Sequence, residues 1–356
     1  AAYGMVEGPV RAGSGGAGAT QYSNWPLGGH GGGRIRIGAS NCVVNGTVRA
    51  NGGNGAYGSG PNSGGGSGGG IQIEAGTISG SGAIQAIGGG GVAGNSNDSG
   101  AGGGGRIVLV YDTMSLPNTS LSARGGNVSR LGGAGTIYLK DNVEAHGDLI
   151  VDNGTVASSL YALLRTGLTT FRSLTLRNAG RLSLTTAEVS AVTVEQPVPL
   201  TGSSVLWLRN GVTLTVTNPT GFDFNVQSSS TLWLEAGSTL AANSVRVNAA
   251  TLSSYIDLSF PVASDLELSG AGTLNVLGSS TLGLTSLDGA NIQSGTLNLP
   301  AGSRLEVTAD AATIASGVTL VKDGTFGATD QIGDLTVLSG GVVTHALRDT
   351  AGLVLN

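Results

Sequence analysis

A short segment of alternating apolar residues recurs in this sequence at a fixed interval, each time directly after a run of glycines. Ile35, Ile71 and Ile107 hold the same place in three such segments and are 36 residues apart. A second segment follows each one, with aligned apolar residues at Val48, Ile84, Leu121 and then at Ala50, Ala86, Ala123. A fixed period of this length is typical of repeat architectures, in which each unit buries its apolar face only against its neighbours.

The repeated segments predict β-strands, because apolar and polar residues mostly alternate and helical periodicity is absent. Glycine accounts for 64 of the 356 residues, more than twice its usual share of about 7%. The glycine runs, such as 64–70 and 102–105, recur in phase with the strands. Such runs are either flexible or pack as polyproline-II-like strands whose backbones approach closely because side chains are missing, and the phase favours ordered packing.

The composition changes near residue 142, where Leu, Val, Thr and Ser replace glycine in a looser repeat. The segments 205–216 and 231–242 superpose with a 26-residue offset, and 295–307 repeats the pattern. We expect two regions: a glycine-rich 36-residue β-repeat over 1–141, and a Leu/Val/Thr-rich β-solenoid over 142–356 that continues the same stack. The predicted fold is all-β, a right-handed parallel β-helix with ordered glycine-rich loops in its N-terminal region. The alternative is a pair of β-sandwiches, since tight Asn-Gly dipeptides such as Asn153-Gly154 also suit antiparallel hairpins.

The charge and hydropathy of the chain exclude some classes of function. Charged residues make up 11%, the formal net charge is −5, and Lys and Arg form no cluster, so we expect no nucleic-acid partner. No apolar run approaches the roughly 20 residues that cross a bilayer, so we expect no membrane insertion. The single cysteine, Cys42, is interpreted as a small packed side chain beside Val43 and Val44.

The glycine-rich segments 64–91, 102–112 and 132–141 resemble modules that recur in very large surface and secreted proteins of bacteria. The closing segment 335–356 resembles a junction in such proteins, after which another β-strand repeat follows. The second half is similar in texture to the β-helical passengers of autotransporters and to filamentous haemagglutinins. The resemblance implies an extracellular or cell-surface location and no known active site.

Histidine and carboxylate residues come together at few places in the sequence. Glu144 and Asp148 flank His146 at two residues on either side, so in a strand the three would share one face and could hold a metal; Gly147 indicates a turn and a solvated edge instead. Asp98, in the stretch 95–100, is a weak calcium candidate or the first residue of an Asx turn.

Other carboxylates bear on whether the chain is an enzyme. Asp265 and Glu267 would share a strand face, which is also expected of a solvated surface, while Asp323, Asp330 and Asp334 are interpreted as turn residues. No nucleophile elbow or phosphate-binding loop is present in a suitable context. We expect no cofactor and no enzymatic activity, although parallel β-helices also include polysaccharide lyases and hydrolases.

Trp207 and Trp233 occupy equivalent positions of the 26-residue repeat. Their leucine neighbours have the opposite parity, so if the leucines enter the core, the tryptophans point outward and stack along the solenoid. Outward aromatic rings suit a sugar or a partner protein, or are covered by another segment of the chain.

The sequence favours a structural role, as a repeating subunit or module of a surface fibre, sheath or stalk. The apolar stretch around Leu353, Val354 and Leu355 predicts an open end that meets a copy of the chain or a neighbouring module head-to-tail. An adhesin that binds polysaccharide is the alternative, and a carbohydrate-active enzyme is third. Ice binding would need regular rows of threonine, which the sequence does not show from coil to coil.

Overall fold

The computed structural model describes residues 4–19, 26–57, 62–94, 98–218, 220–309, 311–326, 332–345 and 353–355. The chain divides into two compact units, the N-terminal unit Ala1–Ser183 and the C-terminal unit Leu184–Asn356. Within the described ranges the regular structure is β, apart from two short 3₁₀ turns, η1 (Asn118–Ser120) and η2 (Ala263–Asp265). None of the helices there is both long and apolar enough to span a membrane.

The main sheet of the N-terminal unit contains six strands in the order β1-β3-β5-β7-β8-β11. Neighbouring strands are parallel except β7 and β8, which form an antiparallel pair. A second sheet, β2-β4-β6, lies in the same coils, and β9 pairs with β12. The strands are β1 (Arg34–Val43), β2 (Thr47–Arg49), β3 (Gly70–Ser79), β4 (Ala83–Gln85), β5 (Arg106–Met114), β6 (Leu121–Ser122), β7 (Thr136–Asp141), β8 (Asp148–Asp152), β9 (Ala162–Leu163), β10 (Thr170–Phe171), β11 (Ser173–Arg177) and β12 (Arg181–Leu184).

The register of these strands follows the sequence repeat. Ile35 pairs with Ile71 and Ile71 with Ile107, which confirms the predicted alignment, and Ile107 pairs in turn with Ile137. Ile71 and Ile107 are fully buried and Ile137 almost so. The apolar residues thus form columns along the stack, and each coil completes the core of the next.

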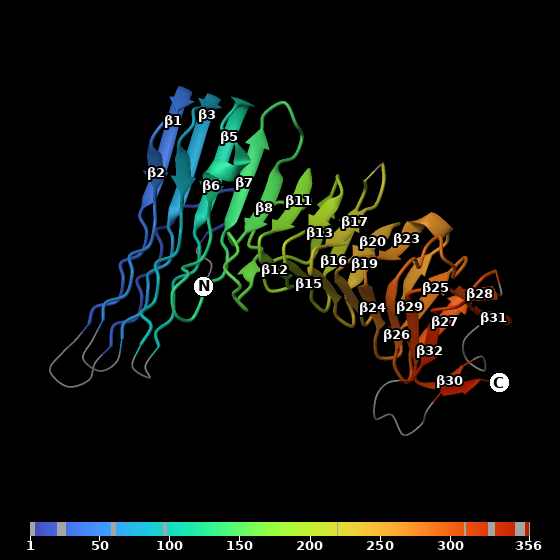
Figure 1. Ribbon diagram of the computed structural model, residues 1–356. Coiled ribbons are helices and arrows are strands. Elements are labelled where there is room, and N and C mark those ends of the chain that lie inside the picture. Colours follow the sequence, from blue (N-terminus) through green and yellow to red (C-terminus); the bar gives the residue numbers. More distant parts are fainter. Residues whose placement is uncertain are drawn as a thin grey trace. The chain divides into compact units, whose positions relative to one another are not determined.

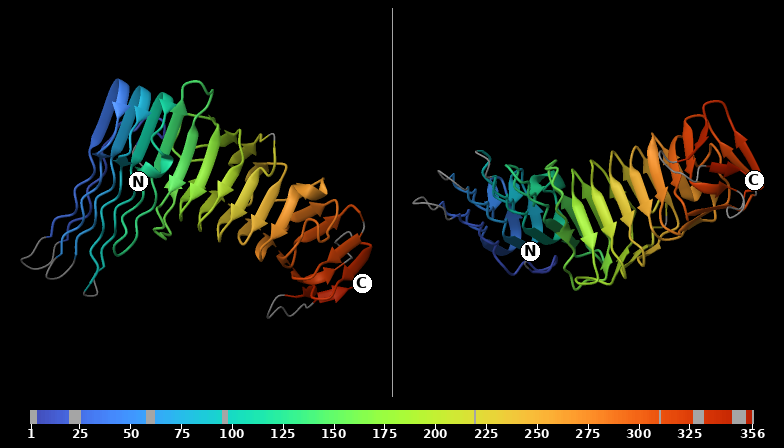
Figure 2. Two further views of the ribbon diagram at one scale, coloured as in Figure 1. Left: turned by 45° about the horizontal axis from the view of Figure 1, so that its top comes forward. Right: turned by 90° about the horizontal axis from the view of Figure 1, so that it is seen from below.

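Glycine-rich segments connect the strands of successive coils. Each connection extends away from the strands and then returns beside itself, and its outgoing and returning halves are called limbs. Figures 1 and 2 show these limbs as parallel extended traces that leave the strands β1, β3 and β5. Their hydrogen bonds repeat every three residues, with N···O distances of 2.7 to 2.9 Å: Gly65 and Gly68 donate to the next limb at Gly100 and Gly103, whereas Gly66 and Gly69 donate to the preceding limb at Gly53 and Ala50. A period of three is that of a polyproline II helix, which confirms ordered packing of the glycine runs.

Close approach of the backbones explains why the limbs contain glycine. A Cβ on Gly102 would overlap the backbone carbonyl of Gly66, and a Cβ on Gly66 would overlap that of His30. Neither glycine has a positive φ, so turn geometry is not the cause. At these two positions the neighbouring limbs therefore leave no room for a side chain.

The C-terminal unit has leaner coils. Its principal sheets follow the orders β14-β17-β20-β23, β15-β18-β21-β24-β26-β29-β32, β13-β16-β19 and β22-β25-β27. The pairs recorded within it are all parallel. The strands are β13 (Ala191–Val194), β14 (Val198–Leu200), β15 (Val205–Leu208), β16 (Thr213–Val216), β17 (Phe224–Gln227), β18 (Thr231–Leu234), β19 (Thr239–Ala241), β20 (Val245–Asn248), β21 (Thr251–Ser254), β22 (Leu258–Phe260), β23 (Leu266–Ser269), β24 (Gly272–Val276), β25 (Thr281–Leu284), β26 (Gly295–Leu299), β27 (Arg304–Val307), β28 (Ala311–Ile314), β29 (Val318–Lys322), β30 (Gly324–Phe326), β31 (Asp334–Val337), β32 (Val342–Thr344) and β33 (Leu353–Leu355).

Stacked parallel coils define the fold as a β-solenoid, as the sequence repeats predict, and the β-sandwich alternative is wrong. The Asn-Gly dipeptides suited that alternative, but Asn51 and Asn54 lie in a limb and not in a hairpin turn. Their side-chain oxygens accept hydrogen bonds from the backbone amides of Ile87 and Gly90 one coil further on. Residue 141 is the last residue of β7, and the predicted division into 1–141 and 142–356 stays a prediction. The right-handed winding stays a prediction.

Candidate functional site

The outer face of the sheet β15-β18-β21 carries the two tryptophans singled out from the sequence. Trp207 pairs in register with Trp233, and the leucines on either side of each one are completely buried. Strand alternation therefore directs both indoles outward, as predicted. The side chain of Trp233 is 37% exposed, and that of Trp207 is half-buried.

A third ring extends this pair into a row. The ring centroids of Trp207 and Trp233 are 6.2 Å apart, and those of Trp233 and Tyr255 are 6.3 Å apart. The guanidinium of Arg209 lies 4.0 Å from the centroid of Trp207 and forms an ion pair with Glu235. Because Arg209 covers Trp207, the accessible part of the aromatic row is the rings of Trp233 and Tyr255. Sequence analysis missed Tyr255 because it lies just beyond β21, outside the repeated motif.

A row of threonines runs beside the aromatic row. One outward threonine in each of five successive strands, β18, β21, β24, β26 and β29, pairs with the next, and all five are half-buried. These residues are Thr231, Thr251, Thr273, Thr296 and Thr319. The expectation that threonine is irregular from coil to coil is therefore wrong over this stretch. A search at a fixed period could not find the row because the coils differ in length.

Amide side chains form a ladder next to the threonines. Asn298 Nδ2 donates to Asn275 Oδ1 at 3.1 Å, and Asn275 Nδ2 donates to Ser253 Oγ at 3.0 Å. Ser253 is in register with Trp233. The face thus joins apolar rings to uncharged hydroxyls and amides, a combination that suits a neutral polyhydroxylated ligand.

The residues Glu144, His146 and Asp148 do not share a strand face, because 142–147 is a turn and only Asp148 belongs to a strand. Both carboxylates pair with Arg172 instead. Its guanidinium donates hydrogen bonds to both oxygens of Asp148, and its Nη1 lies 3.5 Å from Glu144 Oε1. The hydrogen bond to Asp148 raises the pKa of Arg172. In the parts of the chain described, no group of three His, Cys, Asp or Glu residues is arranged to hold a metal.

Three of the remaining carboxylate candidates also have protein partners. Asp98 Oδ1 accepts a hydrogen bond from the Gly94 amide at 3.2 Å, Asp265 accepts one from the Val262 amide, and Glu267 pairs with Arg246 at 2.9 Å. Asp265 and Glu267 line an open depression of about 480 Å³. Asp323 is buried, Asp334 begins β31, and Asp330 lies outside the described residues. The absence of enzymatic activity stays a prediction.

Two further predictions concern the ends of the stack. Leu353, Val354 and Leu355 form β33, which pairs in parallel with β30; their role in assembly stays a prediction. Cys42 is partly buried and packs against the core of the N-terminal unit at its terminal strand.

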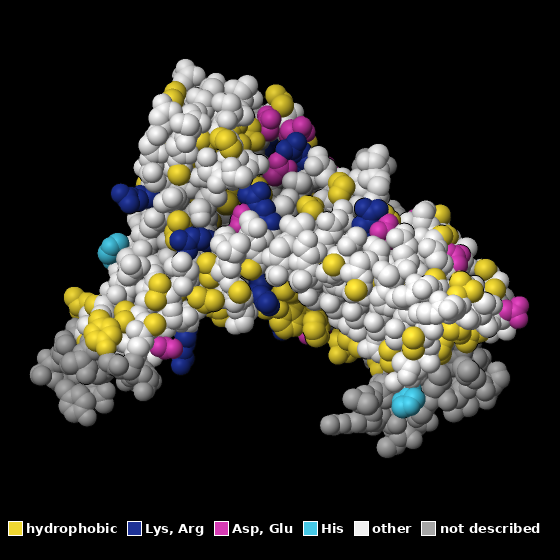
Figure 3. Space-filling model, viewed as in Figure 1, with side chains coloured by type: hydrophobic (Ala, Val, Ile, Leu, Met, Phe, Trp, Pro, Cys, Tyr) yellow, Lys and Arg dark blue, Asp and Glu magenta, His cyan; other side chains and the backbone are white. Residues whose placement is uncertain are grey.

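Charged side chains are sparse over the face shown in Figure 3, where uncharged polar groups and backbone predominate.

The molecule is a β-solenoid with an outward aromatic and threonine face and a hydrogen-bonded glycine layer. No protein-family model, curated protein or solved structure matches this chain.

Proposed function

We propose that this protein is an extracellular structural module, part of a surface fibre, sheath or stalk, that is extended by stacking of a further coil on β1. The observation that carries the proposal is a difference between equivalent residues. Ile71 and Ile73 in β3 are fully buried, whereas their register partners in β1, Ile35 and Ile37, are only half-buried.

The difference follows from the place of β1 in the sheet. β1 is ten residues long, stands at the end of the strand order and pairs only with β3 among the described strands. Among the described residues no strand pairs with its outer backbone edge, and a long unpaired edge is a template for another strand. A coil from a second copy or a neighbouring module would cover Ile35, Ile37 and Val48 as β3 and β4 cover their inner side.

The experiment is a charge substitution at this edge. We expect the chain to associate with increasing concentration in light scattering and to form end-to-end particles in electron microscopy, and Ile37→Lys to abolish both. Gln72→Lys, which adds the same charge to an outward, half-buried position of β3, is the control and leaves association unchanged. A chain that remains monomeric at high concentration, or an Ile37→Lys variant that assembles normally, would contradict assembly at this edge.

Glycan adhesion is the second candidate function, and the aromatic row favours it. Trp233 and Tyr255 are 37% and 40% exposed and lie beside the threonine row, so a sugar ring stacked on them would meet hydroxyl partners. The variant Trp233→Ala is expected to lose binding on a glycan array, with Thr319→Ala, far along the same row, as the control. Equal binding by the wild type and Trp233→Ala would remove this role.

A further inference from the structure

The glycine layer of the N-terminal unit has a gap one coil wide on its outer side. Residues 13–17 lie antiparallel on the limb that contains Gly64 and Ser67. The Gly64 amide donates to Ala17 O and the Ser67 amide to Ser14 O, each at 2.9 Å, and the Ser14 amide donates to Ser67 Oγ at 2.7 Å. Because the period is three residues, the amides of a limb point in three directions. Two of these directions face other limbs, and the segment 13–17 accepts hydrogen bonds in the third.

The amides of the next limb, Gly100–Gly105, point in the same three directions, and in one direction they make no hydrogen bond to a described residue. Ala101 and Gly104 donate to Arg130 and Gly133, while Gly102 and Gly105 donate to Gly89 and Ala86. The amides that correspond to Gly64 and Ser67 are those of Gly100 and Gly103, one repeat later. Neither amide has a hydrogen-bond acceptor among the described groups.

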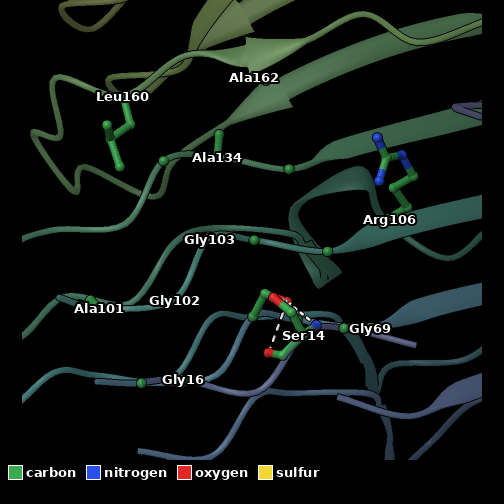
Figure 4. Close-up of a pocket in the computed structure, with 18 of the residues that line it drawn as sticks. Ser14, Gly16, Gly69, Ala101, Gly102, Gly103, Arg106, Ala134, Leu160 and Ala162 are labelled. Carbon is green, nitrogen blue, oxygen red and sulfur yellow. Dashed lines mark hydrogen bonds between the residues drawn. The ribbon is translucent and has the colours of Figure 1, made fainter. Parts of the chain in front are cut away.

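The space in front of these two amides is a groove of about 500 Å³. Its walls are residues 13–17 on one side and the segment 160–163 on the other, and Figure 4 shows Gly103 between Ser14 and Leu160. A Cβ on Gly103 would meet only Gly133 O, at 3.7 Å, and a Cβ on Gly100 would meet nothing within 4 Å. On the neighbouring limb a Cβ on Gly64 would meet the Ala17 backbone at 3.4 Å. The position filled by Ala17 in one coil is thus open in the next.

We propose that this groove binds an extended glycine-rich segment of another polypeptide, antiparallel to Gly100–Gly105, whose carbonyl oxygens accept hydrogen bonds from Gly100 and Gly103. The segment 13–17 supplies the template for the occupant. A Cβ on Gly13 or Gly16 would overlap the limb below, so the occupant needs glycine at every third residue. Leu160, which is 56% exposed at the wall, would be covered by small side chains of the occupant. This site is separate from the β1 edge and does not depend on assembly there.

The probe is a fluorescent peptide with the sequence of residues 12–18, Ala-Gly-Ser-Gly-Gly-Ala-Gly, with blocked ends. We expect saturable binding to the full chain and slower amide exchange at Gly100 and Gly103. The Gly103→Val variant places a branched side chain in the groove, where its Cβ would come no closer than 3.7 Å to Gly133 O. It is expected to weaken binding about tenfold or more, because the occupant is held away from the two amides and loses both hydrogen bonds. Gly33→Val is the matched control, because a Cβ there meets nothing within 4 Å and the site lies outside the groove.

A second probe tests the glycine requirement. The same peptide with alanine at the two positions equivalent to Gly13 and Gly16 is expected not to bind. Binding of the original peptide that is equal in the wild type and Gly103→Val, equal binding of the alanine peptide, or no saturable binding at all would overturn the proposal. One further outcome would also overturn the proposal: the chain self-associates, Gly103→Val abolishes this association, and the peptide does not bind. The groove would then be assigned to a second copy of the chain.

Discussion

Both units stack parallel coils, but the interactions that hold the coils together differ between them. In the C-terminal unit the coils meet through columns of buried aliphatic residues such as Leu232, Leu252 and Leu274, each with no exposed surface. In the N-terminal unit a similar column supports the strands, but the limbs beyond it meet backbone to backbone, and their order comes from hydrogen bonds that repeat every three residues.

The difference explains where each unit tolerates change. An aliphatic core loses stability when atoms are removed, because a cavity forms. At close-packed positions such as Gly66 and Gly102, the glycine layer loses stability when atoms are added, because the nearest neighbour of a new Cβ is a backbone carbonyl that cannot rotate away. The two units should therefore respond in opposite ways to the size of a side chain.

The largest effect is expected in the aliphatic columns. Leu274→Ala, in β24 between Leu252 and Leu297, should lower the free energy of unfolding by about 2–5 kcal/mol through lost burial and the cavity left behind. Chemical denaturation followed by circular dichroism measures the loss. A change below about 1 kcal/mol would show that the column is loosely packed and would weaken the comparison.

The reverse change tests the glycine layer. Gly102→Ala should destabilise the N-terminal unit by about 1–3 kcal/mol, since its Cβ would overlap Gly66 O. Gly283→Ala, in the C-terminal unit, is the control: its Cβ would have no neighbour closer than 3.7 Å, so stability should stay within about 0.5 kcal/mol. Equal stabilities of the two variants in denaturant would contradict the requirement for glycine in the limbs.

A smaller effect is expected in the aromatic row of the C-terminal unit. Removal of the Trp233 ring breaks its contacts with Trp207 and Tyr255, and a ring pair contributes about 0.5–1.5 kcal/mol. Trp233→Ala should therefore cost about 1 kcal/mol in thermal or chemical unfolding, and Trp233→Phe less. No loss of stability would show that the row serves only a ligand.

The smallest effect concerns pH. Burial raises the pKa of Tyr138 above its ordinary value of 10.0, and the charge of Glu7 adds to the shift. The unfolded chain loses this proton first, so the stability from neutral Tyr138 is complete below about pH 10 and is lost as the pH rises through the folded-state pKa. Tyr138→Phe should flatten the alkaline part of the stability curve; an unchanged curve would exclude Tyr138 as a contributor.

The sequence predicts the solenoid and the register because periodicity reports which residues share a face. Ile35, Ile71 and Ile107 are aligned by spacing alone, and the parity of Leu206 and Leu208 places Trp207 outside. The threonine row and Tyr255 escape detection because coil length varies and because a ring after a strand belongs to no repeat. The turn before Asp148 and its pairing with Arg172 depend on contacts between residues 24 apart in sequence, which no local pattern reports.

Amide hydrogen exchange of the limbs tests the central claim, that the glycine runs form a hydrogen-bonded layer. If the claim holds, the hydrogen-bonded amides of Ala86–Gly91 and of Ala101, Gly102, Gly104 and Gly105 exchange slowly, at rates comparable with the buried strand β5. Exchange of these glycine amides at the rate of an unstructured chain, while β5 remains protected, would contradict it.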